Sequence, residues 1–364
     1  MATSIDFSKR EFKGVEFEII DDVDVLTISD PHNLTQISGY IRFAASPGRT
    51  YFRGESSLHT TILPSLLRDG PAVVTARSLE TRSKRIQEYI DDLSGSQCTC
   101  TAHNARRNHR LKYHESHRCD GTIPRKPKGS LVPGTYRAAI EPLLQHYGIR
   151  TRWLDLVDNI WIALWFACHE QKTEYEATGA LGRYARAYAY HLRRSPFKGP
   201  QAKPVSGSTQ DPSAETGDRS DAASQPESLD DAYAYVYMFS TGRLSPTAVP
   251  GYEISEDHRL VDLRYATPSV YLRPHAQHGL LIANRAMPGR NEEHSPETLS
   301  LNSALSGVIR IKLGDALDWL GEGVLTDVFN LFPPAYSDLG YRKLLAARDS
   351  PTSIGAITNY QGGI

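Results

Sequence analysis

Alternating apolar and polar residues near the start of the chain predict a β-hairpin. Over residues 12–28 the apolar positions alternate with polar ones on both sides of an acidic turn at 21–22. Residues 33–45 then follow a helical pattern, with Ser29 or Asp30 as the expected N-cap and a proline suited to the first turn. The N-terminal segment is therefore expected to be a hairpin followed by a helix.

Three further segments predict helices. Residues 75–93 place apolar side chains at helical spacing among charges, as in an amphipathic helix. Residues 136–147 are also periodic and end at Gly148, which suits a helix C-terminus. Residues 161–170 (WIALWFACHE) are apolar nearly all round, which predicts a buried helix.

Several shorter segments have the alternation of strands. Residues 233–240 (YAYVYMFS) give the strongest pattern, and residues 182–192 (GRYARAYAYHL) are their expected partner in one sheet. Short strands are also expected at 270–272, 279–283 and 308–313, and helical turns at 315–320 and 326–331. Strands and helices that do not alternate regularly predict an α+β fold of mixed or antiparallel sheets with flanking helices.

Composition narrows the class of protein. The 364 residues are 40% hydrophobic, enough for one large core or two modest ones. The net charge of −1 gives no global attraction to nucleic acid or membrane, and four cysteines do not make a disulfide scaffold. Because we find neither a long apolar run nor a signal peptide, we expect a cytoplasmic protein with no membrane partner.

Two inserts interrupt these patterns. Residues 195–231 have too little apolar surface to offset chain entropy, which predicts a disordered insert. Residues 95–130 hold three of the four cysteines, several histidines, and eight Lys/Arg against two Asp/Glu. Cys98, Cys100, His114, His117 and Cys119 are suitable ligands for tetrahedral zinc, and the positive charge is suited to phosphate contacts with nucleic acid. A solvated basic loop without metal is the alternative.

Three polar clusters lie beside predicted core elements: YFRG at 51–54, QHYGIRTRWLD at 145–155 and RPHAQHG at 273–279. Binding sites are usually assembled from segments that are distant in sequence, so these clusters are expected to meet in a cleft. The alternative for Arg53 is a structural ion pair with a residue such as Asp155.

These clusters resemble the motifs of the FRG domain family, which is named for the tripeptide at 52–54. The stretch HYGIRTRWLDLVDNIWIALWFA is similar to the family's second motif, H-Y-G-x-x-T-R-L-L-D-x-T-x-N-x-x-x-A-L-x-F-A. RPHAQHGLL is similar to the third motif, in which an arginine precedes Q-x-G and an apolar pair. The resemblance implies an N-terminal segment at 1–45, an FRG domain at 46–345 that carries both inserts, and a tail at 346–364.

The resemblance also implies an ADP-ribosyltransferase-like core. Such enzymes have a first strand that ends in Arg or His, a middle Ser/Thr motif before a helix, and a late strand that carries Glu or Gln. Here the matching catalytic residues would be Arg53, Thr151 and Gln277. NAD would contact residues from all three motifs: Tyr51, Arg53, Gly54, His146, Tyr147, Arg152, Asp155 and Arg273. Many proteins of the family are bacterial or phage-borne, which suggests a toxin or a phage-defence factor.

The chemistry of NAD is compatible with these residue types. An arginine on a rigid strand can hold the pyrophosphate in a bidentate contact, and Gly54 would let the backbone approach it. Departure of nicotinamide leaves an oxocarbenium-like centre that a carboxylate stabilises. Because Gln277 is neutral, Asp155 or Glu55 would supply that charge; Asp155 has the alternative role of capping the following helix.

Three functions therefore remain open from the sequence. The first is an enzyme that transfers ADP-ribose from NAD to a macromolecule, either protein or nucleic acid. The second is a non-catalytic module that binds a nucleotide or a partner in the same cleft. The third is a zinc-dependent nucleic-acid-binding protein in which the core acts as a scaffold.

Overall fold

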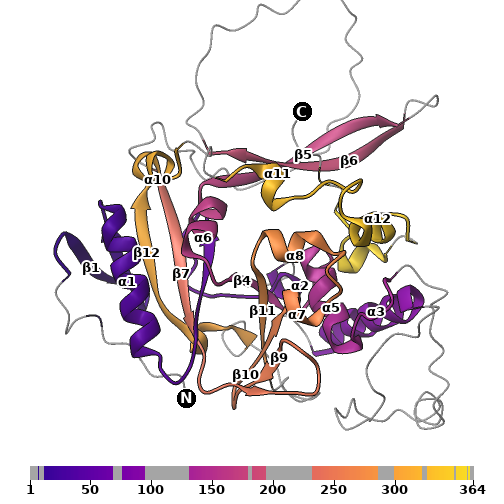
Figure 1. Ribbon diagram of the computed structural model, residues 1–364, viewed down its shortest axis with the longest axis horizontal. Coiled ribbons are helices and arrows are strands. Elements are labelled where there is room, and N and C mark those ends of the chain that lie inside the picture. Colours follow the sequence, from indigo (N-terminus) through magenta and orange to yellow (C-terminus); the bar gives the residue numbers. More distant parts are fainter. Residues whose placement is uncertain are drawn as a thin grey trace, which may run out of the picture.

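A ten-stranded mixed sheet forms the centre of the computed structural model, which describes residues 7, 12–68, 76–94, 131–178, 183–193, 232–285, 299–321, 326–347, 350–358 and 360 (Figure 1). In spatial order its strands are β1 (Val15–Ile20), β2 (Val23–Ile28), β12 (Leu305–Lys312), β7 (Tyr233–Ser240), β3 (Thr50–Glu55), β4 (Leu154–Val157), β11 (Gly279–Asn284), β10 (His258–Asp262), β9 (Tyr252–Ile254) and β8 (Ser245–Pro246). Only β2 and β12 run parallel among these neighbours.

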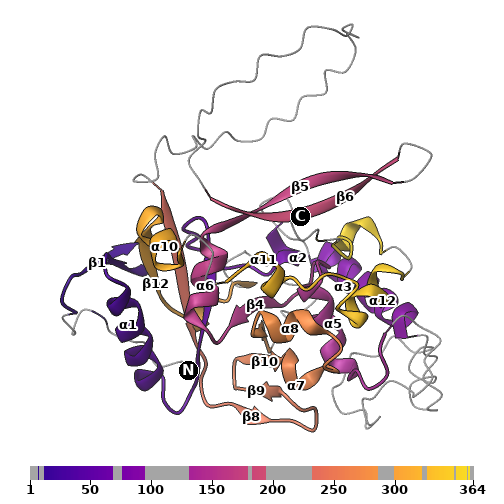
Figure 2. The same ribbon diagram turned by 45° about the horizontal axis from the view of Figure 1, so that its top comes forward.

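Helices cover one face of this sheet in two groups. The first group is α1 (Pro31–Ala44), α6 (Ile160–Ala167) and α10 (Leu313–Trp319), and its core includes Phe52 and Val157. The second includes α2 (Ser65–Arg68), α3 (Ala76–Ser94), α5 (Arg137–His146), α7 (Leu263–Ala266) and α12 (Leu339–Leu345). Figures 1 and 2 show α1 and β1 at one end of the molecule and α3 and α12 at the other.

A third core lies on the opposite face of the sheet. Tyr51, Leu156 and Tyr237 belong to it, and Ile62 and Leu301 pack there from loops. Because side chains alternate along a strand, residues that neighbour these in sequence point to the helix-covered face. The remaining short elements are α8 (Leu272–Ala276), α11 (Val328–Leu331) and two 3-10 turns at Asn302–Ala304 and Thr352–Ile354.

The structure confirms an α+β fold and most of the predicted elements. The hairpin β1–β2 turns at Asp21 and Asp22, both with positive φ. Asp30 is the N-cap of α1 and accepts a hydrogen bond from the backbone N–H of His32. The buried helix is α6, which ends at Ala167, earlier than the pattern predicts, because strand β5 (His169–Thr178) begins two residues later.

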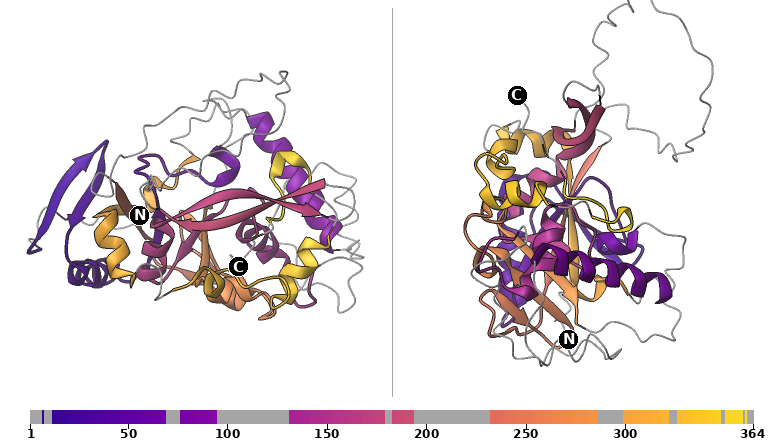
Figure 3. Two further views of the ribbon diagram at one scale, coloured as in Figure 1. Left: turned by 90° about the horizontal axis from the view of Figure 1, so that it is seen from above. Right: turned by 90° about the vertical axis from the view of Figure 1, so that its right-hand side faces the viewer.

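The predicted partner of β7 is wrong. Strand β6 (Arg183–Leu192) pairs with β5 (His169–Thr178) in a separate two-stranded sheet, which lies apart from the main sheet in Figures 2 and 3. Closing the short connection between β5 and β6 costs less entropy than pairing across the 195–231 segment. Both edges of β7 are already occupied, by β12 and by β3.

Two local predictions also change. The segment predicted as a strand at 270–272 leads into α8, which contains Pro274. A proline is tolerated there because the N–H groups of a first helical turn have no intrahelical partner. Asp155 lies within β4 and does not cap α6; the cap is Asn159, whose side chain accepts a hydrogen bond from the N–H of Trp161.

The parts of the chain that the structure describes contain no helix long and apolar enough to cross a membrane. Both predicted inserts lie outside the described residues, and so do the five predicted zinc ligands.

Candidate functional site

Arg53 lies where two central strands separate. β3 pairs with β7 through six residues but with β4 only through Phe52 and Val157. Beyond this pair, a side-chain hydrogen bond connects the two strands: Arg53 Nη1 donates to the carbonyl oxygen of Asp155 at 2.8 Å. Its Nε donates to Glu55 Oε1 at 2.6 Å, so the guanidinium is fixed in the split between the strands.

A second arginine reaches the same carboxylate. Arg68 Nη2 lies 3.7 Å from Glu55 Oε1, and Arg68 Nε donates to the carbonyl oxygen of Leu63 at 2.8 Å. Burial by itself would raise the pKa of Glu55, but the charges of Arg53 and Arg68 outweigh it and hold this pKa below its ordinary value. Glu55 is therefore ionised at neutral pH between two cations.

Helix α5 fixes the carboxylate of Asp155. Gln145 Nε2 donates to Asp155 Oδ2 at 3.0 Å, and His146 Nδ1 lies 3.4 Å from Asp155 Oδ1. Burial acts to raise the pKa of Asp155, whereas the hydrogen bond from His146 and the charges of His146 and Arg53 lower it, and the net shift is downward. Asp155 is thus a second carboxylate that is ionised at neutral pH.

We call Arg53, Glu55, Arg68 and Asp155 the central recess. Their side chains are 19%, 18%, 42% and 34% exposed, so solvent reaches all four. Two fixed cations can hold a phosphate, and two fixed carboxylates can accept from hydroxyl groups or stabilise positive charge. This combination suits a ligand that carries both phosphates and sugars.

Gly54 is required by packing. A Cβ at this position would lie 1.8 Å from the carbonyl oxygen of Ala163 and 2.6 Å from the backbone nitrogen of Ala167. The absence of a side chain therefore lets α6 cross closely over β3, and the space beside residue 54 is occupied by the helix.

Thr151 belongs to the framework beneath the recess. It is fully buried, and both its N–H and its hydroxyl donate to Gln145 Oε1, at 3.0 and 2.9 Å. Ser65 donates to the same oxygen at 2.8 Å. These bonds join α2, α5 and the start of β4, and they hold the Gln145 amide in the orientation that donates to Asp155.

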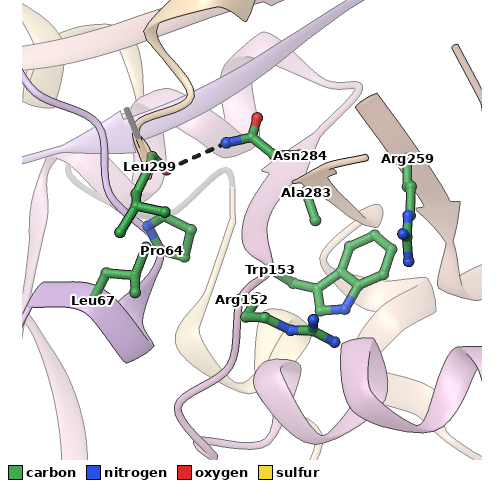
Figure 4. Close-up of a pocket in the computed structure, with 8 residues that line it drawn as sticks. All are labelled: Pro64, Leu67, Arg152, Trp153, Arg259, Ala283, Asn284 and Leu299. Carbon is green, nitrogen blue, oxygen red and sulfur yellow. Dashed lines mark hydrogen bonds between the residues drawn. The ribbon is translucent and has the colours of Figure 1, made fainter. Parts of the chain in front are cut away.

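Arg152 and Trp153 line a small pocket next to this framework (Figure 4). Arg152 forms two hydrogen bonds with Glu141, at 3.3 and 2.9 Å. In Figure 4 the indole of Trp153 lies between the Arg152 and Arg259 side chains. The pocket has a volume of about 30 Å³, room for a few water molecules and too little for a nucleobase.

Residues of the third motif, at 273–279, contact the C-terminal end of α5. Arg273 is fully buried, with its guanidinium carbon 4.4 to 5.4 Å from the ring centres of four aromatic residues: Tyr147, Phe332, Tyr341 and Tyr360. Its Nη1 donates to the carbonyl oxygen of His146 at 3.5 Å. The π faces stabilise the buried charge, so Arg273 holds the later part of the chain against α5.

Gln277 and Gly279 also have packing roles. Gln277 is buried at the end of α8 and donates from Nε2 to the carbonyl oxygen of Leu331 at 2.8 Å. A Cβ on Gly279 would lie 2.8 Å from Cε1 of His146, so glycine lets the imidazole pack on β11. Both residues link the third motif to its neighbours.

The three predicted catalytic residues lie at different places along β4. The Arg53 side chain donates to the Asp155 carbonyl oxygen within β4, and Thr151 lies before the Leu154 end of the strand. Gly279 pairs with Val157 and places Gln277 beyond the other end. Of the other predicted NAD contacts, Tyr51 and Tyr147 are buried, Tyr147 donating to Asp338 at 2.7 Å, while Asp155 joins the recess.

The sequence patterns assigned no role to Arg68, Gln145 or Asp338. Asp338 is fully buried and accepts four hydrogen bonds, from the Tyr147 hydroxyl and from the N–H groups of Leu272, Arg273 and Tyr341. Arg68 directly follows the mainly apolar segment LPSLL. A positive charge beside such a segment is the sequence feature that could have indicated a role for Arg68 in the site.

No cluster of three or more His, Cys, Asp or Glu side chains suited to a metal occurs among the residues that the structure describes.

The fold and the recess define an α+β protein with a charged site at the split of its central strands. The FRG domain profile matches residues 48–176, which include β3, β4 and α6. The chain therefore contains an FRG domain, as the motifs indicated. No curated protein and no solved structure matches the chain.

Proposed function

We propose that the FRG domain binds NAD in the central recess and transfers its ADP-ribosyl group to a macromolecule, either a protein or a nucleic acid. The observation that carries the proposal is the pairing of Arg53 and Arg68 around an ionised, partly exposed carboxylate at the split between β3 and β4. Arginine pairs bind pyrophosphate through charge-assisted hydrogen bonds.

The order of the strands supports the same proposal. Strands β3, β4 and β11 are direct neighbours in the sheet, although they are far apart in the sequence. These are the strands that carry or adjoin the first, middle and late motifs. An assembly of this kind is what a site built from three distant segments needs.

In this proposal a carboxylate supplies the negative charge that the neutral Gln277 cannot provide. In the transfer, the bond between the ribose carbon and the nicotinamide nitrogen breaks, and its electron pair leaves with nicotinamide. The acceptor's oxygen or nitrogen then bonds to that carbon and loses a proton. Glu55, on the same strand and face as Arg53, is the carboxylate nearest to this guanidinium and is suited to stabilise the positive ribosyl centre.

The test is nicotinamide release from NAD by the purified protein, with nucleic acid and cell lysate as acceptors. Arg53→Met should abolish release, whereas Arg243→Met, at an exposed arginine away from the recess, should keep the wild-type rate. Circular dichroism of each variant verifies its fold. Wild-type protein that neither releases nicotinamide nor is protected by NAD from thermal unfolding would refute the proposal.

A second function is favoured by Thr151 and Gln277. Both side chains are buried and bonded to the framework, and this is compatible with a module that binds a nucleotide without turnover. The same assay separates the two functions, because a binding module would be protected by NAD and would release no nicotinamide.

A further inference from the structure

Strand β1 lies at one edge of the ten-stranded sheet. Among the strands that the structure describes, it pairs only with β2, through all of its residues from Val15 to Ile20. The left view of Figure 3 shows the indigo β1–β2 hairpin at one end of the molecule. A strand with a neighbour on one side directs half of its backbone N–H and C=O groups to the other side, where a further strand can bind them.

Two apolar side chains of this edge strand are exposed. Phe17 is 39% exposed and Ile19 is 64% exposed. Phe17 lies directly opposite Leu26 of β2, which is buried in the core that includes α1. Because side chains alternate along a strand, Phe17 and Ile19 share the face of Leu26, but the helix layer that buries Leu26 leaves them exposed. A further strand that covered them would remove apolar surface from water, which favours binding.

The hairpin also carries charge of one sign. Residues 15–24 contain five carboxylate side chains and neither Lys nor Arg. Glu18 forms an ion pair with Arg310 at 2.5 Å. Glu16 and Asp22 are exposed. Because the whole chain has a net charge of only −1, the hairpin is a local concentration of negative charge that attracts a cationic partner.

The same charges decide which kind of strand fits the edge. When two copies of β1 are aligned antiparallel with their apolar faces together, a glutamate lies opposite a glutamate, because the glutamates of the strand alternate with its apolar residues. Like charges directly opposite are destabilising, so the edge is unsuited to a second copy of itself. A strand with Lys or Arg at the facing positions brings opposite charges together instead.

We infer that the outer edge of β1 binds an extended peptide segment in which Lys or Arg alternates with apolar residues. The segment adds a strand to the sheet: its backbone bonds to β1, its apolar side chains cover Phe17 and Ile19, and its cations lie opposite the glutamates. The central recess is built on β3 and β4, in the middle of the sheet. The inference therefore goes beyond the proposed function and does not depend on NAD.

The first experiment measures fluorescence anisotropy of a short labelled peptide that alternates valine and lysine. The protein should bind it at least about tenfold more tightly than a peptide that alternates valine and glutamate, and added salt should weaken binding. Glu16→Lys should weaken binding at least about tenfold, whereas Glu88→Lys, at an exposed glutamate in α3, should keep the wild-type affinity. No binding, equal affinity for the two peptides, or equal weakening by the two substitutions would overturn the inference.

The second experiment locates the peptide by hydrogen exchange and mass spectrometry. Amides of residues 15–20 should exchange at least about tenfold more slowly with the peptide bound, while those of residues 252–254 in β9, near the opposite edge, should keep their rates. Ile19→Thr keeps a β-branched residue and removes exposed apolar surface, so it should weaken binding at least about threefold. Slower exchange only outside residues 15–20 would contradict the assignment. Light scattering of the protein alone tests the other occupant, since a dimer that Ile19→Thr dissociates would assign the edge to a second copy and refute the inference.

Discussion

Replacing Gly54 by alanine tests whether this glycine serves packing or ligand access. The added Cβ would lie 1.8 Å from the Ala163 carbonyl oxygen, and real Cβ contacts are essentially never shorter than 3.0 Å. Helix α6 would have to retreat from β3 by about 1.2 Å, the difference of these two distances. Since α6 is buried on nearly every side, this movement disrupts the core that it shares with Phe52.

We expect Gly54→Ala to lower the free energy of unfolding by about 3 kcal/mol or more, the upper range for an overpacked core. Gly39→Ala is the matched control. Gly39 lies in α1, and a Cβ added there would have no atom within 4 Å, so alanine should stabilise the protein by about 1 kcal/mol through helix propensity.

Urea unfolding followed by tryptophan fluorescence measures both variants, and Trp161 and Trp165 report directly on α6. A Gly54→Ala variant within about 1 kcal/mol of the wild type would refute the packing argument. If that stable variant also lost ligand binding, the glycine would instead serve access to the recess.

Three further changes have defined outcomes. Gly148→Ala should cost at least about 2 kcal/mol in urea unfolding, because φ is +106° and the Cβ would lie 1.9 Å from Thr358 Oγ1, whereas Gly314→Ala, in open space, should be neutral or stabilising. Asp338→Ala should cost at least about 3 kcal/mol, because it leaves four hydrogen-bond donors without the acceptor that they share; a loss below about 1 kcal/mol would contradict this. Glu55→Gln should change the acid dependence of stability. The folded pKa of Glu55 is lower than its ordinary value of 4.5, so its contribution is complete above about pH 5 and declines as pH falls through 4.5 toward the folded pKa. In urea unfolding between pH 6 and pH 3, the difference between wild type and Glu55→Gln should shrink as pH falls, and a constant difference would contradict the assignment.

Local patterns in the sequence predict the elements better than their partners. The acidic turn at 21–22, the Asp30 cap and the apolar run of α6 all depend on neighbouring residues, and all three are observed. Strand β6 has equally clear alternation, yet its partner was predicted wrongly. Alternation shows that a strand has two faces and contains no information about which strand lies beside it.

The site shows the same division. The motifs around Arg53 and Asp155 are visible in the sequence, and the tertiary structure brings these two residues into one recess. The motif that contains Thr151 is equally visible, but the Thr151 side chain is buried and its hydroxyl donates to Gln145. The identity of a polar residue in a motif does not show whether its side chain faces a ligand or is bonded inside the protein. The packing of the surrounding elements sets that direction.

Residues that lie close together in the chain are enough to predict the α+β class, most helices and strands, and the FRG motifs. The contacts of Arg53 and Arg68 with Glu55, and of Asp158 with His278, are seen only in the folded chain. These pairs depend on strand order and register, which are set by long-range packing of the whole sheet. A short sequence window contains none of that information.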